Sequence, residues 1–242
     1  MSMRLRAIMF DLDDTLYSEA DYIASGYRSV CSILAERGIN VTVDEMFTFF
    51  RQSRDHVFDL AASHFHFPRE WVSELVDAYR SHAPTLALDS ETRSVLTLLH
   101  QSYKIGILTD GWKNVQRNKI SALQLHRYCD AVIIADEFGR DYWKPNPAIF
   151  RICCERLGVS TEETLVVGDN PERDMAGAHS AQMACVRIRR SDGYFRSSPS
   201  DYRTDAEIAT LEELPAVLRM LDWRGACPNE SSRASPVGIE GI

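Results

Sequence analysis

The sequence AIMFDLDDTLY, at residues 7–17, joins an apolar run to a cluster of acidic residues. Its first four residues are apolar and indicate a short buried strand. Three aspartates, Asp11, Asp13 and Asp14, follow within four positions. Carboxylates held this close repel one another and cannot all stay ionised without a nearby cation. The stretch therefore predicts a strand that ends at a charged binding site.

The chain beyond residue 88 alternates between apolar strands and amphipathic helices. Strands are expected at residues 104–108, 131–135, 164–167 and 184–188. Helices are expected at residues 90–101, 113–123, 147–157, 172–182 and 211–221. This alternation predicts an α/β fold with a Rossmann-like parallel sheet and helices on both faces.

Residues 18–88 have a different pattern, with no strong strand signal. Helical periodicity covers residues 19–37, 43–58 and 69–81. We therefore expect an α/β core formed by residues 1–17 and 89–222, with residues 18–88 inserted as an α-helical unit after the first strand. Residues 223–242 are rich in serine, proline, glycine and charge, and are expected to form a flexible tail.

Composition and charge argue against several classes of protein. The 242 residues are 45% hydrophobic and 26% charged, which is typical of a globular protein. The net charge of −8 disfavours a nucleic acid polymer or a membrane as the main partner, because both are bound through basic surfaces. No run reaches the ~18 apolar residues of a membrane span, and the apolar run before Asp11 is too short for a signal peptide. Six cysteines without a C-x-x-C pair indicate reduced thiols in a cytoplasmic protein.

Polar residues also follow two later strands. TDG ends one strand at residues 109–111, and GDNPERD ends another at residues 168–174. KPNP, at residues 144–147, lies between them, just before a predicted helix. Ligands of open parallel sheets bind beyond the carboxyl ends of the strands. We therefore expect these segments to form one site with the aspartates that follow the first strand.

The residue types at these strand ends suit phosphate chemistry with a hard metal ion. Oxygen ligands favour Mg²⁺, which takes few carboxylates together with water and substrate phosphate. A carboxylate can act as a nucleophile, and a second carboxyl nearby can serve as general acid and base. Thr109 can donate a hydrogen bond to a phosphoryl oxygen, and Lys144 supplies positive charge for the transferring group.

Taken together, D-x-D-x-T-L, a strand-terminal threonine, K-P-x-P and G-D-x(4)-D resemble the four motifs of the haloacid dehalogenase superfamily in order and spacing. The resemblance covers the chain to about Leu221, and the helical insertion resembles the family's cap domain of the first type. The family usually has a glycine three residues before the motif lysine, where this chain has Asp141, with Gly139 further back. The path of this loop therefore stays open. Trp143 is expected to pack beneath Lys144, with a place in the site wall as the alternative.

The resemblance implies roles for the aspartates. Asp11 is expected to be the nucleophile that forms a phosphoaspartyl intermediate, and also a Mg²⁺ ligand. Asp13 is expected to be the general acid and base and to offer its backbone carbonyl to Mg²⁺. Asp169 is expected to be a further Mg²⁺ ligand. Asp14 has no required role and is interpreted as structural or as support for its neighbours.

The same resemblance implies that Thr109, Asp110 and Lys144 bind the phosphoryl group. Asp174 is expected to orient Lys144 or a metal-bound water, although it could instead favour the positive end of its helix dipole. The implied activity is Mg²⁺-dependent hydrolysis of a small phosphomonoester, such as a sugar phosphate or a nucleoside monophosphate.

Three other functions are weighed against this one. A phosphosugar mutase needs a cap that excludes water, and the sequence does not decide between mutase and hydrolase. A hydrolytic dehalogenase typically lacks an aspartate at the position of Asp13 and needs no metal, so Asp13 disfavours it. A non-catalytic scaffold on this fold is disfavoured by the intact Asp11, Asp13, Lys144 and Asp169.

Substrate choice is expected to come from the cap, which would close over the site. The candidate residues near its mouth are Tyr17, Glu19, Tyr22, Tyr27, Arg51 and Arg54. Tyr22 and Tyr27 are expected to belong to the cap core, whereas the arginines could meet a second acidic group of the substrate. No oligomeric state is indicated.

Overall fold

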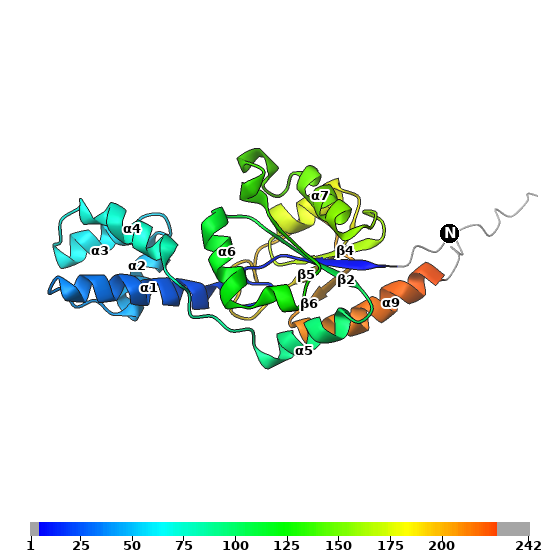
Figure 1. The fold of residues 1–242 in the computed structure, drawn as a ribbon, viewed down its shortest axis with the longest axis horizontal. Coiled ribbons are helices and arrows are strands. Elements are labelled where there is room, and N and C mark those ends of the chain that lie inside the picture. The colour runs from blue at the N-terminus through cyan, green and yellow to red at the C-terminus, as the bar shows by residue number, and fades with distance from the viewer. Residues whose placement is uncertain (1–4, 227–242) are drawn as a thin grey trace, which may run out of the picture.

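The computed structural model describes residues 5–226, drawn in colour in Figure 1. Its sheet has six parallel strands in the order β3-β2-β1-β4-β5-β6. The strands are β1 (Ala7–Phe10), β2 (Lys104–Thr109), β3 (Ala131–Ile134), β4 (Thr164–Gly168), β5 (Ala184–Ile188) and β6 (Ala206–Ile208). All four residues of the internal strand β1 are buried, as expected for a strand covered on both faces. The predicted Rossmann-like α/β fold is confirmed.

Helices cover both faces of this sheet. Successive residues of β1 point to opposite faces, so that Ile8 and Phe10 belong to one hydrophobic cluster and Ala7 and Met9 to another. The first cluster includes side chains of α5 (Ser90–Leu99), α6 (Lys113–Ala122) and α9 (Leu214–Ala226). The second includes side chains of α7 (Pro147–Leu157) and α8 (Ala176–Ser180). Figure 1 shows α7 above the sheet and α5 and α9 below it.

Four helices between β1 and α5 form a separate group, which we call the helical insertion. They are α1 (Glu19–Glu36), α2 (Val43–Gln52), α3 (Val57–Phe65) and α4 (Trp71–Ser81). Their apolar faces pack into a third hydrophobic cluster, with Val30, Leu34, Met46 and Leu75 among its fully buried residues. Figure 1 shows this group at the left of the molecule, beyond one end of the sheet.

The structure corrects several predicted boundaries. The helix predicted at residues 43–58 is two helices, because Ser53 has an extended backbone (φ −159°, ψ 116°) that ends α2 before α3 begins. The helix predicted at residues 172–182 begins as a π-helical turn, η4 (Pro171–Met175), and continues as α8. Strand β6 was not predicted, because its three residues include an exposed glutamate and lack a continuous apolar run.

The last helix also differs from its prediction. Helix α9 extends to Ala226 and therefore includes residues 223–226, which were predicted as tail. The rest of the predicted tail, residues 227–242, lies outside the described residues. Within residues 5–226, every helix is too short or too polar to cross a membrane.

Candidate active site

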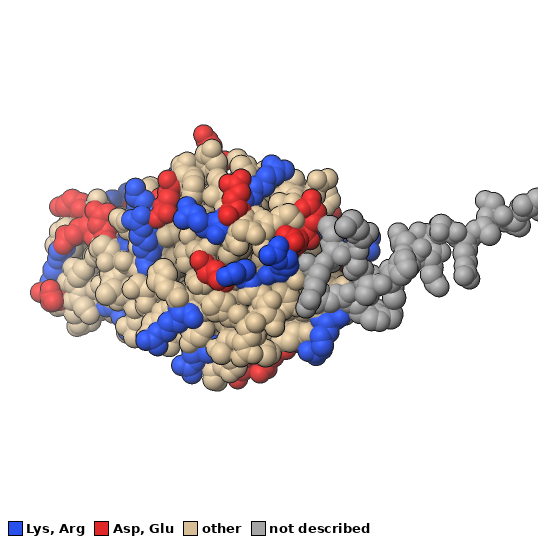
Figure 2. Space-filling view, turned by 45° about the vertical axis from the view of Figure 1, so that its right-hand side comes forward, with Lys and Arg blue, Asp and Glu red and all other residues tan. Residues whose placement is uncertain are grey.

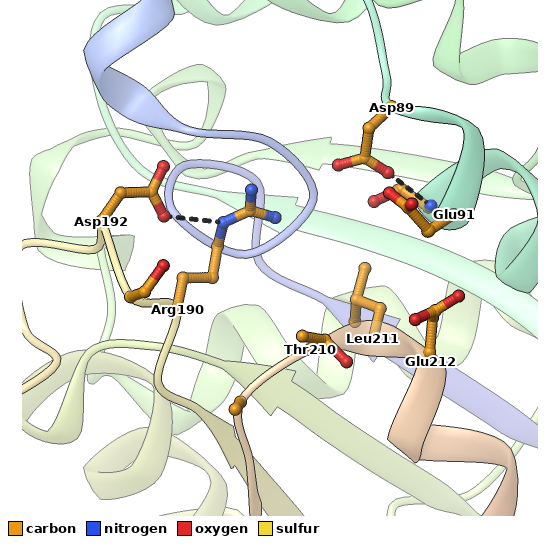
Figure 3. Close-up of a pocket in the computed structure, with 10 residues that line it drawn as sticks. Asp89, Glu91, Arg190, Asp192, Thr210, Leu211 and Glu212 are labelled. Carbon is orange, nitrogen blue, oxygen red and sulfur yellow. Dashed lines mark hydrogen bonds and ion pairs between the residues drawn. The ribbon is translucent and has the colours of Figure 1, made fainter.

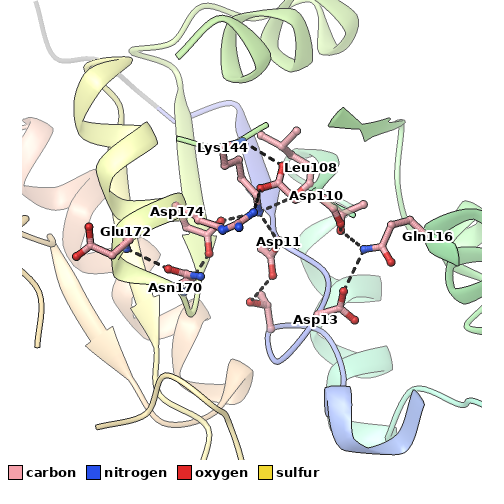
Figure 4. Close-up of polar contacts among 12 residues, drawn as sticks. Asp11, Asp13, Leu108, Asp110, Gln116, Lys144, Asn170, Glu172 and Asp174 are labelled. Carbon is pink, nitrogen blue, oxygen red and sulfur yellow. Dashed lines mark hydrogen bonds and ion pairs between the residues drawn. The ribbon is translucent and has the colours of Figure 1, made fainter. Parts of the chain in front are cut away.

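The predicted site residues meet where β1, β2 and β4 end. All seven line one cavity of about 260 Å³, and Figure 4 shows several of them pointing toward one another. They are Asp11, Asp13, Thr109, Asp110, Lys144, Asp169 and Asp174. Parallel pairing places the ends of these strands at one edge of the sheet, which is why segments far apart in the sequence converge there.

Lys144 lies at the centre of a buried network of ion pairs (Figure 4). Its ammonium group donates hydrogen bonds to Asp11, to Asp174 at 2.7 Å and to the backbone oxygen of Leu108 at 3.3 Å. The side chain is only 3% exposed. Burial by itself lowers the pKa of Lys144, but the charges of Asp11 and Asp174 raise it well above its ordinary value. Lys144 is therefore a permanent cation.

The structure shows the path of the loop that carries Lys144, which the sequence did not predict. Gly139 has a φ of +101°, which favours glycine, and begins a short 3₁₀ turn, η3 (Arg140–Tyr142). Trp143 follows, packs against the second hydrophobic cluster of the core and is not among the residues that line the cavity. The Lys144-Pro145 peptide bond is cis. The glycine that precedes the lysine by five positions thus begins the turn that leads into the site.

Asp110 connects this loop to the segment after β4. Its carboxylate accepts hydrogen bonds from the backbone N–H of Lys144 at 3.1 Å and from Arg173 at 2.8 Å. Because an ionised carboxylate only accepts hydrogen bonds, a phosphate contact from Asp110 would have to use its backbone N–H. Thr109 accepts a hydrogen bond from Gln116 and faces the same cavity. The phosphate-binding roles of Thr109, Asp110 and Lys144 stay predictions.

Three carboxylates gather on one side of Lys144. Oxygen atoms of Asp11, Asp169 and Asp174 lie within 4.8 Å of one another. Burial, together with the charge of Asp11, raises the pKa of Asp169 to about 9. Burial also raises the pKa of Asp11 to about 7, although Lys144 opposes the rise. One lysine cannot neutralise three acids, and an all-oxygen donor set with excess negative charge fits Mg²⁺.

Asp13 belongs to a second network. Its carboxylate accepts hydrogen bonds from Lys119 at 2.8 and 2.9 Å, from Gln116 at 3.0 Å and from the hydroxyl of Tyr17. Burial by itself raises the pKa of Asp13, but Lys119 and these hydrogen bonds bring it below its ordinary value. Lys119 and Gln116 were not predicted. Their i, i+3 spacing on one face of α6, the helix that follows β2, is the signal that could have indicated them.

Two positions at the site are restricted, Asp14 by its backbone conformation and Gly168 by the space around it. Asp14 has a φ of +54°, and its carboxylate accepts hydrogen bonds from the backbone N–H groups of Glu19 at 2.8 Å and Tyr194 at 2.9 Å. This supports a structural role, in which Asp14 joins the end of β1 to α1 and to the loop after β5. Gly168 packs so closely that a Cβ atom there would lie 2.5 Å from the carboxylate of Asp174.

The candidates near the mouth of the cavity separate into two groups. Glu19 and Arg54 line the cavity. Tyr22 and Tyr27 are 4% and 2% exposed. Tyr27 belongs to the hydrophobic cluster of the helical insertion, as expected, whereas Tyr22 belongs to the first cluster, with residues of the sheet, and not to the expected cap core. Arg51 is exposed on α2 and is not among the lining residues.

A second pocket lies elsewhere on the molecule. It has a volume of about 310 Å³ and is lined mainly by polar residues near the start of α5 and in the loops around β6 (Figure 3). Four of its side chains are acidic, and Arg190 is paired with Asp192 at 3.4 Å. None of the predicted site residues lines it, so the smaller cavity is the candidate active site.

Comparison with known proteins identifies the family of the chain. A sequence profile described as haloacid dehalogenase-like hydrolase matches residues 8–188. A glyceraldehyde 3-phosphate phosphatase of Methanopyrus kandleri is 31% identical, over 90% of this chain and 98% of that protein. An N-acylneuraminate-9-phosphatase of Rattus norvegicus is 28% identical, over 91% and 96%. The structure of the HAD-hydrolase YfnB from Bacillus subtilis has the same fold, with a TM-score of 0.70 at 21% identity over 89% of this chain and 99% of that one.

Proposed function

The chain belongs to the haloacid dehalogenase-like hydrolases and is a phosphatase, and from this premise we propose that it hydrolyses a small phosphomonoester through a phosphoaspartyl intermediate. The observation that carries the proposal is the position of Asp11. Its carboxylate lies at the end of β1, is held by Lys144 and faces the cavity that Asp169 also lines. At about 260 Å³ the cavity is smaller than the ~300–1,000 Å³ typical of ligand pockets. A sugar phosphate or a metabolite of similar size is therefore the proposed substrate.

The proposed reaction has two steps, in which Asp11 and Asp13 act in turn. An oxygen of Asp11 attacks phosphorus, the bond from phosphorus to the alcohol oxygen breaks, and Asp13 gives that oxygen a proton. Asp13 then takes a proton from water, the water oxygen attacks phosphorus, and the bond to Asp11 breaks to release inorganic phosphate. Lys144 and Thr109 would hold the phosphoryl oxygens throughout.

The contacts of Asp13 bear on the first step. Lys119 keeps Asp13 ionised, so Asp13 must gain a proton before it can act as an acid. The ammonium group of Lys119, 2.8 Å away, is a charged donor beside it. The second step needs no such transfer, because the ionised carboxylate is already a base. The two steps thus need different protonation states of Asp13, and Lys119 favours the ionised state that the second step uses.

Mg²⁺ is the proposed cofactor. Asp11 and Asp169 would hold it, with the backbone carbonyl of Asp13, and when bound it would offset negative charge on the phosphoryl oxygens. Support comes from the carboxylate excess described above. Asp174 would act on Lys144 rather than on the metal, because its two oxygens already accept hydrogen bonds from Lys144 and from the backbone N–H of Asn170 at 3.0 Å.

The surface and the thiols support the expected partners and location. On the visible face in Figure 2, acidic and basic side chains are interspersed and no large basic patch is seen, which supports a small substrate rather than a nucleic acid polymer. Cys31, Cys129, Cys153, Cys154 and Cys185 are free, and Cys227 lies outside the described residues. Free thiols support a reducing, cytoplasmic location.

The test is release of inorganic phosphate from p-nitrophenyl phosphate and a panel of metabolite phosphates, in Mg²⁺ and in EDTA. We expect turnover in Mg²⁺ only, and a loss on the order of 10⁴-fold or more in Asp11→Asn, because the nucleophile is removed. Asp77→Asn, an exposed aspartate on α4, is the matched control and should keep full activity. Turnover that persists in Asp11→Asn would overturn the proposal.

A further inference from the structure

Arg54 is held in a defined orientation at the mouth of the active-site cavity. It lies in the loop between α2 and α3 and lines the cavity. Its guanidinium carbon is 4.7 Å from the ring centroid of Phe50 and 4.0 Å from that of Tyr194. One nitrogen donates a hydrogen bond to Glu19 at 2.9 Å. Phe50 belongs to the helical insertion and Tyr194 to the core, so Arg54 is fixed from both sides.

These contacts leave part of the guanidinium group available to a ligand. Stacking occupies the faces of the planar group and leaves its edge for hydrogen bonds. Glu19 uses one nitrogen, and no other acceptor for Arg54 is seen within the described part of the chain. The side chain is 35% exposed, so a ligand in the cavity can reach it. A planar, bidentate acceptor such as a carboxylate matches the geometry of this edge.

The other two cations that line the cavity already form ion pairs with carboxylates of the site. Lys144 is shared between Asp11 and Asp174, and Arg173 is paired with Asp110 beside the backbone of Lys144. Both lie on the core side, where the phosphoryl group is proposed to bind. Arg54 is the lining cation that the helical insertion contributes. An anionic group at the far end of a substrate would therefore meet Arg54.

We propose that Arg54 binds a carboxylate of the leaving group, so that the substrate is the phosphate ester of a small hydroxy acid. This inference rests on the proposed function, because the phosphoryl end must occupy the Lys144 side of the cavity. Lys144 and Arg54 line the same space of about 260 Å³, so one small molecule can reach both. Glu19 competes for Arg54, and its charge opposes that of the carboxylate. Removal of the charge of Glu19 should therefore strengthen the preference for a substrate with a carboxylate. Removal of Arg54 should abolish the same preference.

The test compares two substrates of equal length, 3-phosphoglycerate and glycerol 3-phosphate, which differ by a carboxylate in place of a hydroxymethyl group. For the wild-type protein in Mg²⁺, we expect kcat/KM to favour 3-phosphoglycerate by on the order of 10-fold, as for one hydrogen-bonded charge pair. Arg54→Met should bring the ratio of the two values close to one. Glu19→Gln should raise the ratio above that of the wild type. Arg51→Met, which removes an exposed arginine of α2, should leave it unchanged.

The possible results separate the role of Arg54 from the proposed phosphatase function. If Arg54 only ties the insertion to the core, Arg54→Met will lower both kcat/KM values together and the ratio will stay at its wild-type value. That result, or a wild-type ratio near one, overturns the role of Arg54 while hydrolysis of p-nitrophenyl phosphate still supports the proposed function. If the wild-type protein hydrolyses no phosphate ester in Mg²⁺, the proposed function fails, and this inference fails with it.

Discussion

Two lysines hold the aspartates of the site, and they do so differently. Lys144, 3% exposed, is shared between Asp11 and Asp174, and the pKa of Asp11 still lies at about 7. Lys119, 5% exposed, gives two contacts to the single carboxylate of Asp13 and lowers its pKa. The carboxylates around Lys144 outnumber the nearby cations and are suited to a metal ion, whereas Lys119 keeps the carboxylate of Asp13 ionised.

The largest loss of stability should come from Lys144→Met, which removes the lysine that Asp11 and Asp174 share. The substitution leaves Asp11 and Asp174 buried without their cation, so we expect a loss of about 3–5 kcal/mol in the free energy of unfolding. Urea unfolding measures it. Lys113→Met, an exposed lysine at the start of α6, is the control and should change stability by less than about 0.5 kcal/mol. A loss no larger than that of the control would show that the network does not stabilise the fold.

A smaller loss is expected from Lys119→Met. Asp13 keeps its hydrogen bonds to Gln116 and Tyr17, and its side chain is 24% exposed, so solvent can replace part of the lost contact. We expect a loss of about 2 kcal/mol in the same urea experiment. A loss equal to that of Lys144→Met would contradict the distinction between a shared and a dedicated lysine.

The smallest effect should be the stabilisation of the wild-type protein by Mg²⁺, and it should depend on pH. The folded-state pKa values of Asp169, about 9, and Asp11, about 7, lie above the ordinary value of 3.8. The metal-free folded state therefore binds extra protons between about pH 4 and 9, and the stability linked to these two groups is lost as pH rises through that window. Mg²⁺ at ten times its dissociation constant should add about 1.4 kcal/mol.

Thermal melts in EDTA and in Mg²⁺, at pH 6 and at pH 9 and at matched ionic strength, measure this effect. At a fixed concentration of Mg²⁺, the increase in Tm should be larger at pH 9, because the carboxylates bind the ion only when deprotonated. Lys119→Met should keep the full increase, since the carboxylate of Asp13 lies outside the proposed metal site. A larger increase at pH 6 would contradict the proposed ligands.

The two lysines also show what the sequence could predict. Lys144 stands in a short motif, K-P-x-P, and the order of this motif among the others resembles the haloacid dehalogenase superfamily, so the resemblance indicated its place in the site. Lys119 lies in the middle of a polar helix, where a lysine is ordinarily solvated. Its burial depends on how α6 packs against the segment after β1, which is tertiary information.

The insertion was less predictable than the core for a similar reason. Helical periodicity was predicted without a break over residues 43–58, whereas the structure ends α2 at Gln52, with Ser53 in an extended conformation, and begins α3 at Val57. The break matters for function, because it creates the loop that carries Arg54. Strand β6 escaped prediction because a three-residue edge strand depends on pairing with β5 rather than on a pattern of its own.

Gly168 has a consequence for protein engineering. Its missing side chain makes room for the carboxylate of Asp174, which holds Lys144. A designer who grafts these acids and this lysine onto another parallel sheet must therefore also place glycine one residue before the equivalent of Asp169, the proposed Mg²⁺ ligand. In a graft that reproduces every charged residue but has alanine at this position, the Cβ atom of the alanine would displace the carboxylate that corresponds to Asp174.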